Sequence, residues 1–176
     1  LPDAPHQPMG YLGADLTAVG GDTPAYRVTK LFPGDGFDLA ARSPLLTPGI
    51  DIKVGDHILA VSGHRVRVNQ DLQQLLIGTA GQAITLTVND RPSFDGAREV
   101  TVTPLSSEYQ ARYYDWVASR VRYIREQGGE TLGYVHIPNM GMGGLGEFGK
   151  HYYPNLNRDG MIYDVRFNGG GFIDAM

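Results

Sequence analysis

The chain has 176 residues, a net charge of −4, 41% apolar residues and no cysteine. This composition fits one large domain or two small ones and excludes a disulfide framework and a cysteine nucleophile. The acidic balance argues against a nucleic-acid partner, because phosphate binding needs a basic surface, and no run reaches the ~20 apolar residues of a membrane span. The chain begins Leu1-Pro2 and stops soon after a glycine cluster, so we expect a piece of a longer protein.

The first 105 residues alternate between short strand patterns and turn signals. Strands are predicted at 11–16, 25–31, 58–61, 84–88 and 100–102. Asn69-Gln70-Asp71 is typical of a helix cap, and the leucines that follow predict a short helix that closes near Gly78. The pattern indicates a small domain built mainly of β-strands.

The run Val54-Gly55-Asp56-His57-Ile58-Leu59-Ala60-Val61-Ser62-Gly63, with the short helix and the Thr/Val hairpin after it, resembles a bacterial-type PDZ domain. The resemblance covers residues 10–105, and we assign residues 1–105 to this domain. It implies a barrel or sandwich of five to six strands with short helices. In such domains an extended peptide adds as a strand to a sheet edge beside a helix.

The resemblance also implies a binding loop and a groove. Tyr11, Leu12, Gly13 and Ala14 match the loop whose backbone N–H groups hold a terminal carboxylate. The groove would run between residues 14–18 and the helix at 70–77, and it would take a peptide substrate or a C-terminal peptide. The alternative is that this domain only packs or acts as a hinge.

Residues 106–176 predict a different arrangement. Ser107-x-x-Gln110 is a capping-box pattern, and apolar residues then recur at helical spacing until Gly128-Gly129. A strand at 132–138, a helix at 147–153 and a strand at 160–165 follow. Strand, helix, strand predicts a βαβ crossover between parallel strands.

This second part resembles the start of the catalytic core of tricorn-type serine peptidases, which are related to the C-terminal processing peptidases. The residues that carry the resemblance are Gly133–Pro138, Glu147-Phe148 and the run Asp164-Val165-Arg166-Phe167-Asn168-Gly169-Gly170-Gly171. The implied fold class is mixed α+β: a PDZ-like domain followed by an incomplete α/β core of the ClpP/crotonase-like kind. The resemblance implies that the intact protein is a homo-oligomer that hydrolyses peptide bonds through an acyl-enzyme.

The glycine run suggests a catalytic role. Acyl transfer by a serine needs backbone donors where the oxyanion forms, and glycines after a buried strand expose N–H groups without side chains. By the resemblance Gly171, and next Gly170, is the oxyanion-hole candidate, with Asp164, Arg166 and Asn168 bracing the turn. The alternative is a plain strand-to-helix turn. A phosphate loop is excluded, because the Gly-Lys-Ser/Thr ending is missing.

The rest of a serine-peptidase site is not visible. No serine stands in a nucleophile-elbow context, and no two histidines have metal-ligand spacing. We therefore expect no metal or organic cofactor, and we expect this fragment alone to be inactive. The resemblance favours a cytoplasmic location and leaves a periplasmic one open. A non-catalytic PDZ-type adaptor is the rival function.

Overall fold

The computed structural model describes residues 7–35, 38 and 41–171. The chain forms two compact units, which divide between Asp115 and Trp116. The predicted domains, 1–105 and 106–176, stay a prediction. The helices and strands are β1 (Ala14–Val19), β2 (Ala25–Leu31), η2 (Pro44–Leu46), β3 (His57–Val61), β4 (His64–Arg65), η3 (Leu72–Leu76), β5 (Ile84–Asn89), β6 (Arg98–Val102), α1 (Tyr109–Gly128), η4 (Gly129–Thr131), β7 (Leu132–His136), α2 (Met142–Tyr152), η5 (Tyr153–Asn155) and β8 (Gly160–Asp164).

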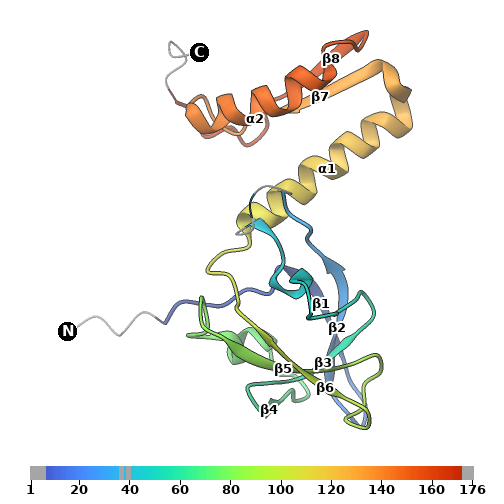
Figure 1. Cartoon of the computed structure of the whole chain (residues 1–176), viewed down its shortest axis with the longest axis vertical. Helices are drawn as coiled ribbons and strands as arrows, with labels where there is room; N and C mark the ends of the chain where they lie inside the picture. Colours follow the sequence, from blue (N-terminus) through green and yellow to red (C-terminus); the bar gives the residue numbers. More distant parts are fainter. Residues whose placement is uncertain (1–6, 36–37, 39–40, 172–176) are drawn as a thin grey trace, which may run out of the picture. The chain divides into compact units, whose positions relative to one another are not determined.

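The first unit is built on an antiparallel sheet in the order β1-β2-β3-β5-β6, with β4 paired to β3 outside this path (Figure 1). Its two ends are β1 and β6. The bridge between Tyr11 and Leu105 joins the segments beside these ends. The mixed α/β class is confirmed, whereas the named strands pair as an open path, so closure into a barrel is not confirmed.

The core of the first unit follows from alternation along the strands. In β5, Ile84, Leu86 and Val88 are buried while the threonines between them are half-buried, which is the period of a strand with one face on the core. All five residues of β3 are buried, so both faces of this strand are covered. The sheet packs on one apolar cluster, to which Leu12, Leu72 and Leu76 also belong.

Two elements of the first unit differ from the sequence prediction. The strand predicted at 11–16 is β1 and starts at Ala14, because Tyr11 instead bonds Leu105. The predicted helix at 70–77 is the short 3-10 helix η3, capped by Asp71, whose Oδ1 accepts from the Gln73 N–H at 3.0 Å. Five residues are too few for a stable α-helix without strong packing.

The second unit contains a βαβ arrangement, as predicted. Strands β7 and β8 pair in parallel from Leu132–Gly160 to His136–Asp164, and α2 connects them. β7 is almost fully buried. Helix α1, predicted to end at Gly128-Gly129, ends at Gly128.

Helix α2 begins five residues before the predicted start at Glu147. Glycines at 143, 144 and 146 lower helix propensity, so the sequence did not predict this first turn of α2. Asn139 compensates, because its Oδ1 accepts from the N–H groups of Gly141 and Gly144, each at 3.0 Å. Gly144 lies so close to Asn139 that a Cβ there would be 1.7 Å from the Asn139 carbonyl oxygen.

Candidate functional site

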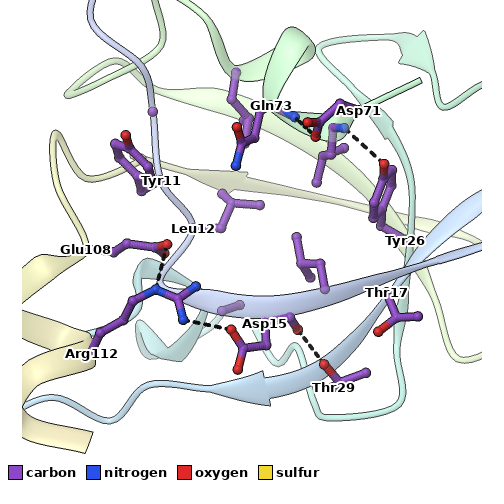
Figure 2. A pocket seen from close by; sticks show the side chains of 15 residues that line it. Tyr11, Leu12, Asp15, Thr17, Tyr26, Thr29, Asp71, Gln73, Glu108 and Arg112 are labelled. Atoms are coloured by element: carbon purple, nitrogen blue, oxygen red, sulfur yellow. Dashed lines mark hydrogen bonds and ion pairs between the residues drawn. The ribbon is translucent and has the colours of Figure 1, made fainter. Parts of the chain in front are cut away.

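A groove follows the free edge of β1 in the first unit (Figure 2). Its cavity has a volume of about 400 Å³. Its walls come from the segment before β1, from β1 and β2, from η3 and from the first turns of α1: Gly10, Tyr11, Leu12, Ala14, Asp15, Leu16, Thr17, Tyr26, Thr29, Asp71, Leu72, Gln73, Leu76, Glu108 and Arg112. The peptide groove between residues 14–18 and 70–77 stays a prediction, and the lining of this cavity includes residues of both segments.

The loop before β1 is fastened on one side. The Leu12 carbonyl accepts from the buried Ser43 hydroxyl at 2.8 Å, and the Gly13 carbonyl accepts from the Phe32 N–H at 3.0 Å. Tyr11 exchanges two backbone hydrogen bonds with Leu105. The backbone of this loop is therefore held by the carbonyl groups of Tyr11, Leu12 and Gly13 and by the N–H of Tyr11.

The N–H groups of the same loop differ from its carbonyl groups in their hydrogen bonding. Within residues 7–35, 38 and 41–171, no group accepts from the N–H of Leu12 or of Gly13. Adjacent unbonded amides are the donors that hold an anion or a carbonyl oxygen in backbone nests. Three of the four predicted loop residues, Tyr11, Leu12 and Ala14, line the cavity, and Gly13 lies between them.

Tyr26 fixes the opposite wall of the groove. Its hydroxyl donates to the Gln70 carbonyl at 2.7 Å and accepts from the Leu72 N–H at 3.2 Å, so β2 holds the start of η3. A second hollow of about 480 Å³ shares Tyr26 and Asp71 and continues past Ala18 to Gly20. The two hollows together follow the length of β1.

Charged side chains gather at the loop end of the groove. Arg112 Nε lies 2.8 Å from Glu108 Oε1, and Arg112 Nη1 lies 2.9 Å from Asp15 Oδ1. Partial burial opposes ionisation of Arg112, but the hydrogen bonds to the two carboxylates outweigh it and raise the pKa of the guanidinium. The guanidinium also stacks over Phe32, 4.6 Å from the ring centroid.

The glycine run of the second unit lies beside the segment after β7. The Gly169 N–H donates to the Pro138 carbonyl at 2.9 Å, and the Met140 N–H donates to the Gly170 carbonyl at 2.8 Å. Asn168 contributes from its side chain, because its Nδ2 donates to the Ile137 carbonyl at 2.9 Å. These bonds hold the two segments together beyond the end of the strands.

The two candidate glycines differ in their N–H groups. Gly170 N–H donates to Asn168 Oδ1 at 2.7 Å. Among the residues that the structure describes, nothing accepts from Gly171 N–H. Gly171 has a φ of +142°, and a Cβ there would lie 2.6 Å from the Met140 carbonyl, so both its conformation and its surroundings require glycine.

Asp164 lies at the start of this turn and accepts several hydrogen bonds. Its Oδ1 accepts from the backbone N–H of Arg166 at 3.0 Å and from Arg166 Nε at 2.9 Å, while its Oδ2 accepts from the buried Tyr134 hydroxyl at 2.7 Å. The hydrogen bonds from Arg166, and then that from Tyr134, hold the pKa of the Asp164 carboxyl well below its usual range. Burial and the neighbouring carboxylate raise the pKa of Tyr134. Asp164 is therefore ionised and tightly bound.

Aromatic packing supports the same turn. The Trp116 ring lies 4.8 Å from the His136 ring and 5.9 Å from the Phe167 ring, centroid to centroid. His136 is buried, and its Nε2 donates to the Arg166 carbonyl at 2.8 Å. The His136 imidazole therefore joins the end of β7 to the turn after β8.

Sequence reasoning missed Glu108, Arg112 and Tyr134. Glu108 lies just before α1 and Arg112 in its first turn. Both are far along the chain from β1, and no local pattern signals such a contact. Tyr134 lies in a recognised strand, but its pairing with Asp164 depends on the parallel register of β7 and β8. None of the three belongs to a motif that spacing alone identifies.

Neither a metal cluster nor a membrane-spanning helix occurs in the described part of the chain. No group of three or more His, Cys, Asp or Glu side chains there could hold a metal ion. No helix formed by these residues is both long and apolar enough to cross a bilayer.

The chain is similar to known proteins over nearly its whole length. Residues 10–107 match the family model described as the tricorn protease PDZ domain. The chain is 40% identical over 169 residues to "Tricorn protease homolog 1" of Streptomyces coelicolor, covering 96% of this chain and 16% of the relative. It is 35% identical over 176 residues to "Putative Tricorn-like protease C-terminal subunit" of Sulfurisphaera tokodaii, covering 96% of this chain and 19% of the relative.

A solved structure is also similar. The "Crystal structure of the tricorn protease" matches with a TM-score of 0.79 at 31% identity, over 95% of this chain and 16% of that chain. The chain thus spans less than a fifth of the length of these relatives.

Proposed function

Because the chain belongs to the tricorn protease PDZ domain family, we propose that it binds an extended peptide and forms the opening part of the core of a serine-type peptidase. The free edge of β1, with the unbonded amides of Leu12 and Gly13 at its start, is the observation that carries the peptide-binding function. The intact protein would hydrolyse peptide bonds through an acyl-enzyme. Its relatives support the peptidase class, since they are named as tricorn proteases.

Peptide binding would proceed by strand addition. A strand at a sheet edge presents unpaired N–H and C=O groups, and a peptide laid beside β1 would pair with them. The peptide would lie between β1 and η3, with an acceptor oxygen on the amides of Leu12 and Gly13. The hollow that continues to Gly20 would hold its other end.

Titration of the isotope-labelled chain with an extended hexapeptide, followed by NMR, tests this function. We expect amide shifts to change along Leu12–Ala18 and along η3, and to remain constant in β6. The matched control is the same peptide with alternate amides N-methylated, which removes its ladder donors and should abolish binding. Equal binding of both peptides, or no shift along Leu12–Ala18, would refute strand addition.

In the catalytic step we assign the oxyanion donor to Gly171. An oxyanion hole needs an N–H group that donates to no protein group. Among the described residues nothing accepts from Gly171 N–H, whereas Gly170 N–H donates to Asn168 Oδ1. Asp164 and Arg166 would keep the turn in place through their mutual hydrogen bonds. The nucleophile and the base would come from the rest of the intact protein.

The test compares Gly171→Ala with Gly169→Ala in the intact protein. A Cβ at Gly171 would overlap the Met140 carbonyl, whereas at Gly169 the nearest atom would be 3.9 Å away. We expect Gly171→Ala to slow acylation by a fluorophosphonate about 100-fold, the magnitude for an oxyanion donor, with Gly169→Ala near wild type. Equal rates for both variants would exclude Gly171. Absence of any labelled serine in the wild type would favour the adaptor.

A further inference from the structure

We propose that the groove along β1 selects peptides that carry a basic side chain, and that Arg112 occupies the seat of this side chain when the groove is empty. The inference rests on the proposed peptide binding and defines its ligand class. The seat consists of Asp15, Glu108 and the Phe32 ring, and we call it the basic-residue seat.

The cavity of the groove is lined by a net negative charge. Four ionisable carboxylate and guanidinium groups line the cavity: Asp15, Asp71, Glu108 and Arg112. Three negative charges and one positive charge leave a net charge of −2. Asp71 lies on the η3 side and the others on the opposite side (Figure 2), so a peptide between these walls passes carboxylates on both sides. Such a potential favours cationic ligands and disfavours anionic ones.

The geometry around Arg112 shows what the seat can hold. Two carboxylate oxygens meet two different guanidinium nitrogens, at 2.8 Å for Glu108 and 2.9 Å for Asp15. The Phe32 ring lies 4.6 Å from the guanidinium carbon, which is a cation–π distance. Carboxylates with an aromatic face form a suitable site for arginine or lysine, and the chain fills it with its own arginine.

Arg112 is placed so that it can be displaced. Its side chain is 46% exposed, and ion pairs at such exposed positions contribute little stability. When a basic peptide side chain enters, the Arg112 side chain can turn into solvent with its helix unchanged. The two carboxylates then exchange one cation for another.

The charges of Asp15, Glu108 and Arg112 also influence which kind of peptide terminus the groove accepts. A free carboxylate at the loop end would approach Asp15 and Glu108, whose combined charge exceeds that of Arg112 by one. The amides of Leu12 and Gly13 can instead accept a main-chain carbonyl oxygen, which is neutral. The groove is therefore suited to an internal segment or an amidated end at least as well as to a free terminus.

Fluorescence anisotropy with the full chain tests the proposal. One labelled hexapeptide carries lysine at its central position, and its partner carries norleucine there, which has a similar length and no charge. We expect the lysine peptide to bind about fivefold tighter at low salt, the size of one favourable charge pair. This preference should disappear in about 0.5 M salt through screening.

Three variants locate the effect. Arg112→Gln vacates the seat and should enlarge the lysine preference, whereas the double variant D15N/E108Q should remove it. Asp90→Asn removes one negative charge at an exposed loop position outside the groove and should leave the preference unchanged. The readout is the ratio of lysine-peptide to norleucine-peptide affinity, and Asp90→Asn should leave both affinities within twofold of wild type.

The outcomes separate the two proposals. If neither peptide binds, the peptide-binding function fails and this inference fails with it. If both bind equally, or if Asp90→Asn changes the preference as much as D15N/E108Q does, only the inference is overturned. Tighter binding of a free carboxylate than of the amidated form also overturns it.

Discussion

The contact between Asn139 and helix α2 gives the sharpest stability prediction, because α2 contains two glycines with opposite surroundings. At Gly144 a Cβ would lie 1.7 Å from the Asn139 carbonyl oxygen, whereas at Gly146 no atom lies within 4 Å. The substitution Gly→Ala is the same at both positions. Helix propensity alone would make both variants more stable by about 1 kcal/mol.

For Gly146→Ala we expect that gain of up to about 1 kcal/mol in the free energy of unfolding. For Gly144→Ala, Asn139 must move away, which breaks its two hydrogen bonds to the start of α2 at about 1 kcal/mol each. Overpacking adds roughly 1–3 kcal/mol. After the propensity gain we expect a net loss of about 3 kcal/mol.

Urea unfolding followed by tryptophan fluorescence measures both values. Trp116 is the single tryptophan of the chain and packs on His136 and Phe167, so its emission reports the second unit. The midpoint should rise for Gly146→Ala and fall for Gly144→Ala. Equal shifts in the same direction would show that the close approach to Asn139 does not exist, and the account of how α2 begins would be wrong.

Three further substitutions test the groove and the turn. Ser43→Ala removes the hydroxyl that holds the Leu12 carbonyl, and thermal unfolding of the first unit should show a loss of about 1–2 kcal/mol; unchanged stability would contradict this bond. Tyr26→Phe frees the start of η3, so peptide affinity measured by anisotropy should fall severalfold while the sheet stays folded. Tyr134→Phe removes one donor to the ionised Asp164, at about 1.5 kcal/mol above pH 4. Since the pKa of Asp164 is lowered on folding, its stabilisation is present above its ordinary value of 3.8 and is lost as pH falls through the folded-state value. The difference between Tyr134→Phe and wild type should stay constant while Asp164 is ionised in both folded proteins, and it should shrink only as pH falls through the folded-state pKa of Asp164. Equal stability of the two proteins at pH 7 would refute the pairing.

Much of the fold could be predicted because the relevant signals are local. Alternating residues in Ile84–Val88 indicate a half-buried strand whatever its partners, and the cap at Asp71 forms within three residues of chain. The start of α2 could not be predicted in this way. Its glycines argue against a helix, and only the approach of Asn139 stabilises that turn.

The sequence by itself determined the family, the element order and the glycine run, because short motifs carry these in the identity and spacing of neighbouring residues. Only the tertiary structure decided that Arg112 reaches the groove beside Asp15, and that Gly170 N–H is bonded while Gly171 N–H has no partner among the described residues. Such facts join segments far apart along the chain or depend on the direction of a single N–H bond. Backbone geometry sets both, and residue identity alone does not.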